Sequence, residues 1–180
     1  MNLNGRVGAR RIARSEWTTQ RWKNGAGITH EILRWSALPS DDAYDVRLSV
    51  AEVEGAQPFS FFPGYFRSLV VLEETTLRLG DEAMTKGRVF DFRGDLPMAT
   101  TGEGRATDLN VISRLERRAR VEVASRETER ERRALAVFAL EPVVLRGDAE
   151  RALDAGDTWI DLAGDADYVA SAPVVWVRFG

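Results

Sequence analysis

The segment ALAVFALEPVVLRGDAERALDAGDTWIDLAGDADYVASAPVVWVRF, residues 134–179, decides the expected fold of this 180-residue chain. Short apolar runs alternate in it with turn residues, and a Gly-Asp pair recurs at 147–148, 156–157 and 164–165. Short strands at even spacing, separated by such turns, are typical of a β-barrel or sandwich. No helical apolar period of any length appears in this half, so we expect an all-β protein.

Strands are also expected upstream of this segment, where apolar and polar residues alternate. The predicted strands are residues 29–35, 44–53, two strands within 68–79, 89–92, 108–114, 120–123, 135–140, 143–146, 152–153, 159–162, 168–170 and 174–179. The charge-dense segment 125–133 is expected to be a solvated loop or a short helix.

A weak internal similarity suggests that the chain contains a duplicated β unit. Segments 69–72 and 77–80 resemble segments 135–138 and 143–147 in type and spacing. Similarity between two halves of a chain indicates a repeated structural unit. We therefore expect a single domain with approximate halves at residues 10–115 and 116–180.

Composition excludes several classes of function. The chain has 25 basic and 28 acidic residues, a balance that gives no reason to expect a nucleic-acid partner. It has no cysteine, which excludes disulfides, zinc-thiolate sites and cysteine nucleophiles. No apolar run reaches membrane-spanning length and no secretory signal is apparent, so we expect a bacterial cytoplasmic protein without a membrane partner.

His30 is the single histidine of the chain, and this limits metal chemistry. A site built from several histidines is impossible, and His30 and Glu31 point to opposite faces of a strand. A metal held by Glu31, Asp108 and His30 remains conceivable, but the prediction is that the protein binds no metal and no cofactor.

The stretch WKNGAGITHE, residues 22–31, combines a glycine loop with a polar strand. Gly25 and Gly27 allow the backbone to adopt positive φ or to approach another group closely. Thr29 and Glu31 share one face of the following strand. Such a face suits the wall of a pocket for a small polar ligand, and equally an edge strand with its polar face in water.

Two later strands have a polar face of the same kind. In the first strand Arg47 and Ser49 alternate with apolar residues, and in the second Asp108 and Asn110 do so. Arg67 follows the aromatic segment 59–66, for which core packing is expected for most rings. A cation that leaves an aromatic corner is a candidate to face a pocket.

Taken together, these stretches resemble the HutD/Ves family of small bacterial proteins. The matching pieces, which follow in the expected order, are residues 22–31, 47–51 (RLSVA), 58–64 (PFSFFPG), Arg67 with 69–72, 92–95 (FRGD), and 108–111 (DLNV) with Arg114. The last third of the chain matches only in its general β pattern. Two departures are Ala26, where the family usually has glycine, and His30, where it usually has arginine.

The resemblance implies a cupin-type (RmlC-like) β-barrel with two barrel-like halves. It also implies a non-enzymatic regulator of histidine utilisation that binds a small carboxylate metabolite of the formylglutamate or urocanate type. The Ves branch of the family is linked to stress or cold response. The resemblance does not tell which branch this chain belongs to.

The residues themselves favour a pocket for an anion, because arginine binds carboxylates through paired hydrogen bonds. We expect cations to hold the ligand, neutral polar groups to orient it, two acids to balance the charge, and one ring to form an apolar wall. The candidate ligand-binding residues are Lys23, Asn24, Thr29, Glu31, Arg47, Ser49, Phe62, Arg67, Asp108, Asn110 and Arg114. No catalytic residue is assigned.

Three alternatives stay open. Arg47, Glu31, Asp108 and Arg114 can instead form an internal ion-pair network that holds the barrel in shape. The chain can also be a metal-independent enzyme acting on a small amide or formyl substrate, with His30 or Glu31 as general base. The third alternative is a stress-related interaction module. A homodimer paired through edge strands is a further expectation.

Overall fold

The computed structural model describes residues 2–4, 8–22, 25–37, 43–124, 132–163 and 166–179. These residues form β-strands and two short 3-10 helices, Arg14–Glu16 and Leu115–Arg117, so the all-β prediction is confirmed. Within the described ranges no helix is long and apolar enough to cross a membrane.

The strands follow one another along the whole described chain. They are β1 (Asn2–Asn4), β2 (Arg10–Ile12), β3 (Thr18–Arg21), β4 (Gly27–Ser36), β5 (Val46–Glu54), β6 (Tyr65–Val71), β7 (Arg78–Leu79), β8 (Glu82–Ala83), β9 (Val89–Arg93), β10 (Thr100–Thr101), β11 (Arg105–Arg114), β12 (Ala119–Ala124), β13 (Arg132–Arg133), β14 (Ala136–Ala139), β15 (Val143–Arg146), β16 (Glu150–Leu153), β17 (Thr158–Ile160), β18 (Asp167–Ala170) and β19 (Val174–Phe179).

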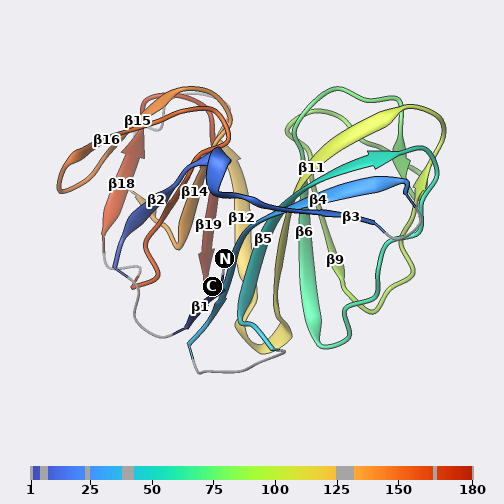
Figure 1. Cartoon of the computed structure of the whole chain (residues 1–180), viewed down its shortest axis with the longest axis horizontal. Helices are drawn as coiled ribbons and strands as arrows, with labels where there is room; N and C mark the ends of the chain where they lie inside the picture. Colours follow the sequence, from blue (N-terminus) through green and yellow to red (C-terminus); the bar gives the residue numbers. More distant parts are fainter. Residues whose placement is uncertain are drawn as a thin grey trace.

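The strands form two halves that lie side by side (Figure 1). The first half has a seven-stranded sheet in the order β1-β4-β5-β11-β6-β9, with β3 beside β4, and a small sheet β10-β7-β8. The second half has a five-stranded sheet β12-β19-β14-β17-β2 and a four-stranded sheet β13-β18-β15-β16. Each half therefore combines a larger and a smaller sheet.

The main core lies between the two large sheets. Leu48 and Val50 of β5 and Leu109 of β11 belong to the same buried cluster as Val175 and Val177 of β19. Each such side chain contributes roughly 1.5–3 kcal/mol when it is fully buried. Because successive residues of a strand point to opposite faces, the other face of β5 and β11 is left outside this core.

The interiors of the two halves differ in what fills them. The second half is packed with large side chains, including Trp159, Tyr168 and Trp176, which form a buried cluster with smaller apolar residues. The first half has a buried apolar cluster of its own, but the buried residues of its inner sheet face also include Arg67 and Asp108. The first half is therefore the candidate location of a ligand site.

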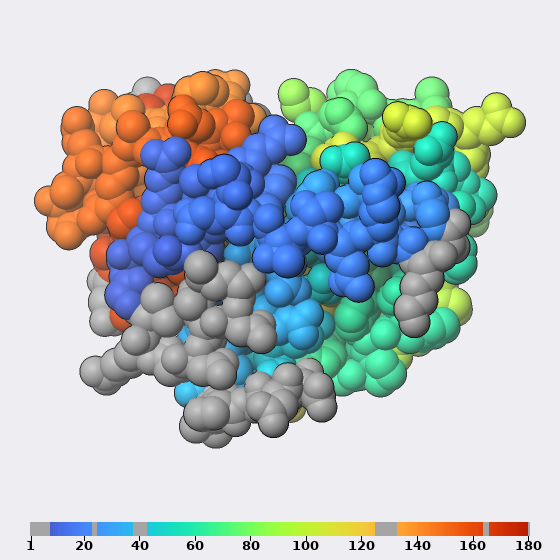
Figure 2. Space-filling view, viewed as in Figure 1, coloured from blue at the N-terminus to red at the C-terminus, as the bar shows by residue number. Residues whose placement is uncertain are grey.

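The N-terminal segment connects the two halves. Strand β2 pairs with β17 in the second half, whereas β3 pairs with β4 in the first. Figure 2 shows this blue segment running across both halves on one face of the molecule. The side chain of Asp157 fixes the crossing point, because it accepts hydrogen bonds from the backbone N–H groups of Arg14 and Asp154. Strand β2 therefore belongs to a sheet of the second half, and β3 to the large sheet of the first.

The internal similarity maps onto corresponding strands. Segment 69–72 lies in and just after β6 of the first large sheet, and 135–138 lies in and just before β14 of the second. From each, the chain passes to the small sheet of the same half, at β7 and at β15.

Sequence alternation did not predict every element. Strand β3 lies in a stretch without a clear period, and all four of its residues are exposed. Of the expected loop or helix at 125–133, residues 125–131 lie outside the described part of the chain, and 132–133 form β13.

We predict that Gly94→Ala destabilises the protein by about 1–3 kcal/mol, because a Cβ there forces the backbone apart. Such an atom would lie 2.5 Å from the carbonyl oxygen of Phe62 and 3.1 Å from that of Tyr65. Urea unfolding measures the change in the free energy of unfolding. The matched control is Gly8→Ala, because a Cβ at Gly8 has nothing within 4 Å. Equal stability of the two variants would contradict the prediction.

Candidate functional site

A cavity of about 480 Å³ opens on the face of the seven-stranded sheet that points away from the main core. Strands β4, β5, β6 and β11 supply its floor, and β3 and the loop after β5 supply further walls. The lining residues are Gln20, Arg21, Trp22, Thr29, Arg47, Ser49, Ala51, Val53, Pro58, Phe59, Ser60, Phe62, Arg67, Asp108, Asn110 and Ile112.

Strand register brings the polar residues of the floor together. Asn110 of β11 lies opposite Ser49 of β5, and Ile112 lies opposite both Arg47 of β5 and Arg67 of β6. Directly opposed residues of antiparallel strands have Cβ atoms about 4.5–5.5 Å apart. Side chains far apart in the sequence therefore share one surface of the sheet.

The guanidinium of Arg67 is buried in this surface and surrounded by aromatic rings. Its Nη2 donates to Asn110 Oδ1 over 2.6 Å. The rings of Phe59, Phe62 and Phe92 lie 4.9, 5.4 and 5.2 Å from its Cζ atom. Burial lowers the pKa of Arg67 to about 10, although the charge of Asp108 opposes this change. Arg67 thus carries a positive charge at neutral pH in a largely dry place.

Asp108 is a second buried ionisable group of the cavity wall. Its side chain is 0% exposed, and Oδ1 accepts a hydrogen bond from Asn110 Nδ2. Its Oδ2 has no hydrogen-bond partner anywhere in the described chain. Burial raises the pKa of Asp108 to about 7, although the charge of Arg67 and the hydrogen bond from Asn110 act in the opposite direction.

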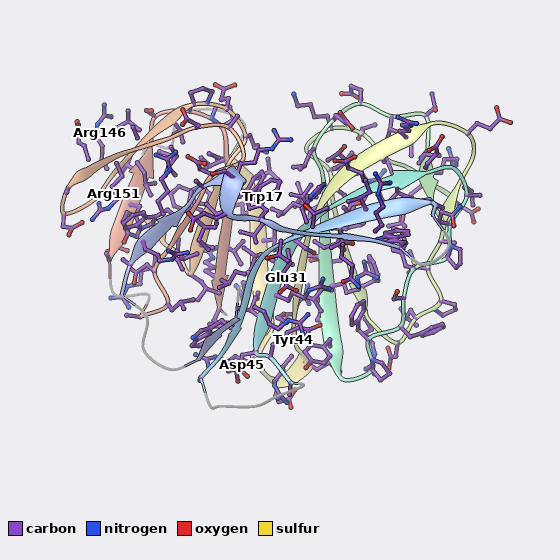
Figure 3. All side chains as sticks on the ribbon, viewed as in Figure 1. Trp17, Glu31, Tyr44, Asp45, Arg146 and Arg151 are labelled. Carbon is purple, nitrogen blue, oxygen red and sulfur yellow. The ribbon has the colours of Figure 1, made fainter. Side chains whose placement is uncertain are left out.

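Arg47 is held in place from the side by Glu31. Glu31 Oε2 accepts from Arg47 Nε over 2.7 Å and from Arg34 Nη2 over 2.9 Å. Burial alone would raise the pKa of Glu31, but the hydrogen bonds and charges of Arg34 and Arg47 lower it overall. Figure 3 shows Glu31 among the strands of the first half, near Tyr44. Glu31 itself does not line the cavity.

Arg114 is placed elsewhere. Its Nε lies 3.1 Å from Asp45 Oδ1, and Arg117 lies near the other oxygen of the same carboxylate. Arg114 is not among the lining residues. Of the four residues in the alternative of one internal ion network, Glu31 and Arg47 form an ion pair, which Arg34 extends, and Arg114 pairs separately with Asp45. No ion pair within 4.0 Å joins Asp108 to another described residue.

The glycine stretch shapes the rim of the cavity. Trp22 Nε1 donates to Thr29 Oγ1 over 2.8 Å. A Cβ on Gly27 would lie 2.8 Å from both the Trp22 ring and the carbonyl oxygen of Glu52, so the close approach requires glycine here. Two candidate residues of this stretch, Lys23 and Asn24, lie outside the described residues.

His30 does not line the cavity. It bridges two neighbouring strands, with Nδ1 2.9 Å from Thr19 Oγ1 and Nε2 3.1 Å from a carboxylate oxygen of Glu52. Its ring lies 5.9 Å from that of Trp17, at the junction of the halves (Figure 3). Among the described residues no three His, Asp or Glu side chains gather closely enough to hold a metal ion.

The cavity brings together Thr29, Arg47, Ser49, Phe62, Arg67, Asp108 and Asn110 of the predicted site. Sequence reasoning missed the contributions of Gln20, Arg21, Phe59 and Ser60 to the wall. The aromatic segment is also less of a core than expected. Phe61 is 61% exposed, and Phe59 and Phe62 pack on a cation. The one sequence signal for a pocket beside these rings was Arg67, which follows them in the chain.

Several known proteins are similar to this chain in sequence and in fold. The family model described as HutD matches residues 14–174. Protein Ves of Citrobacter koseri is 36% identical over 149 residues, which cover 78% of this chain and 77% of that protein. A crystal structure of a conserved protein of unknown function from Pseudomonas aeruginosa PAO1 has a TM-score of 0.82 at 28% identity, covering 96% of this chain and 99% of that one.

More distant structures support the fold alone. HutD from Pseudomonas fluorescens SBW25 has a TM-score of 0.79 at 24% identity, covering 96% of this chain and 100% of that chain. A cupin 2 conserved barrel domain protein from Leptotrichia buccalis has a TM-score of 0.53 at 7% identity, covering 97% and 99%. The expected cupin-type fold is confirmed. From the family model and the likeness to Ves, the chain belongs to the HutD family.

Proposed function

We propose that the protein is a non-enzymatic binder of a small organic carboxylate, which it holds in the cavity of the first half. The single observation that carries this proposal is the buried guanidinium of Arg67, with Arg47 on the same wall. A charge removed from water without an ion pair is costly. Among the described residues no carboxylate forms an ion pair with Arg67, and an anionic ligand would supply a counter-charge.

The rest of the wall suits such a ligand. Ligand sites of small molecules combine apolar walls with a few placed polar groups. Phe62 provides an apolar surface, and Thr29, Ser49 and Asn110 provide neutral hydrogen-bonding groups. Arg47 is fixed by Glu31 through one nitrogen, which orients its remaining N–H groups. Less ordering is then required when the ligand binds.

For the physiological role, we propose that the carboxylate is a metabolite of histidine utilisation, of the formylglutamate or urocanate type, and that its binding serves regulation. Support comes from membership of the HutD family. The cytoplasmic location and the homodimer remain predictions.

A second candidate is a metal-independent enzyme that acts on a small amide or formyl substrate. Asp108 favours this candidate, because a carboxyl group with a pKa of about 7 in a cavity is a suitable general acid or base at neutral pH. His30 does not support it, since His30 does not line the cavity. Incubation of formylglutamate with the protein, followed by assay for free formate, separates the two candidates. Turnover would replace the binding proposal.

We predict that formylglutamate or urocanate raises the thermal unfolding midpoint, and that Arg47→Gln and Arg67→Gln each weaken this effect. A ligand at 100 times its Kd stabilises the folded state by about 2.7 kcal/mol, which corresponds to several degrees in a chain of this size. Loss of one arginine should weaken binding about tenfold or more. Differential scanning fluorimetry across a ligand titration measures both quantities.

The control for this experiment is Arg146→Gln. Arg146 lies on the far side of the second half (Figure 3) and is half exposed. Its substitution should leave the ligand-induced shift unchanged. Absence of a shift with any carboxylate, in a folded protein, would refute the binding proposal and favour an interaction module.

We also predict that the titration of Asp108 lowers the free energy of unfolding as pH rises from about 4 to about 7. The pKa of Asp108 is about 7 in the folded chain and about 3.9 in an unfolded one. Between these values the folded state binds a proton that the unfolded state lacks, so stability falls by up to about 1.4 kcal/mol per pH unit. Above about pH 7 Asp108 is ionised in both states, so this group no longer changes the free energy of unfolding with pH.

The test compares the natural chain with Asp108→Asn by urea unfolding at pH 5, 6, 7 and 8. Asparagine has a similar shape and no titrating proton. The variant should therefore gain stability relative to the natural chain as pH rises towards 7. A difference that stays constant over this range would show that Asp108 does not titrate there.

A further inference from the structure

Asn110 connects the two buried charged groups of the cavity. Its Oδ1 accepts from Arg67, and its Nδ2 donates to Asp108. Both ends of the amide are thereby used, and the two charged groups share one hydrogen-bonded chain on the floor of the cavity. Buried polar networks of this kind respond as a unit when one member changes.

Among the described residues, Arg67 is the cation whose charge stabilises the carboxylate of Asp108. The neighbours that face Asp108 across the sheet are Ala51 of β5 and Val71 of β6, which carry no charge. Arg21 and Arg47 also line the cavity, but neither bonds to Asp108. The ionised state of Asp108 therefore depends on the positive charge of Arg67.

An anion beside Arg67 changes this balance. Its negative charge offsets that of the guanidinium and adds direct repulsion towards the carboxylate. Interactions between charges are strong in a poorly solvated place, because the local dielectric constant is low. The ionised form of Asp108 becomes less favourable, and the neutral form, which needs a proton, becomes more favourable.

Resting on the proposed function, we infer that binding of a carboxylate in the cavity is coupled to uptake of a proton by Asp108. The ligand's charge then enters the protein together with a compensating proton. By reciprocity, protonation of Asp108 strengthens binding of the anion, so affinity falls as pH rises. The cavity is thus a pH-dependent anion site.

Calorimetric titration with formylglutamate, and with glutarate as a second probe, tests the coupling. Repeating each titration in buffers of different ionisation enthalpy gives the number of protons taken up. Asp108 with a pKa of about 7 is half protonated at pH 7 in the free protein, so uptake should be about half a proton per anion there. At pH 6 uptake should be much smaller, and at pH 8 affinity should be clearly lower than at pH 7.

Two variants identify the group that takes up the proton. Asp108→Asn should bind the anion without proton uptake, and at pH 8 it should bind at least as tightly as the natural chain, because the repelling charge is gone. The matched control is Glu54→Gln, an exposed acid that pairs with Arg105 outside this cavity. It should retain the proton uptake of the natural chain.

The outcomes separate the two proposals. Binding with no proton uptake at pH 7 and 8, or uptake that persists in Asp108→Asn, would overturn the coupling and leave the binding function intact. No binding of either probe at any pH would overturn the proposed function together with the coupling. The comparison across pH uses the natural chain alone, so it remains decisive if Asp108→Asn does not fold.

Discussion

The burial of Arg67 is the constraint on which the rest of the site depends. Removing a guanidinium from water is costly, and here aromatic rings and Asn110 surround the cation, with no opposite charge of the described residues in contact. This arrangement requires the loop with Phe59 and Phe62 to fold back over β6. The loop does so at Gly94, where Phe62 N–H donates to the glycine carbonyl over 2.7 Å and no Cβ fits. A backbone contact thus sets the environment of the charge.

In the proposed function, the first half of the cupin-type fold carries the ligand site. Both contribute apolar faces to the shared core, which fixes the two large sheets against each other. The second half then fills its own interior with Trp176 and Tyr168. The first half has a separate apolar cluster and also keeps Arg67, Asp108 and Asn110 inside. The apolar clusters of both halves stabilise the fold, which allows the first half to carry buried polar groups as well.

Alternation in the sequence was sufficient to predict the two strands at the centre of the site. In the central parts of β5 and β11 apolar buried residues, such as Leu48 and Leu109, stand at every second position, so the period of two assigns Arg47 and Asn110 to the opposite face. The period of two does not predict which side chains contact one another. Whether an arginine meets a carboxylate, as Arg114 meets Asp45, or a cavity depends on contacts between distant segments. Strand β3 was missed for a different reason, because an exposed edge strand has no apolar period.

A comparison of two buried acids in this chain supports our assignment of Asp108 to the proposed site. Asp157 is also buried, yet both of its oxygens accept backbone N–H groups and Arg11 lies 2.6 Å from Oδ2. The fold thus satisfies a structural acid fully. Asp108 receives one hydrogen bond from a side chain and keeps Oδ2 unpartnered among the described residues. Asparagine at this position would avoid the cost of a buried charge. In the proposed site, a buried acid that faces a cationic cavity has a use for its proton or its charge.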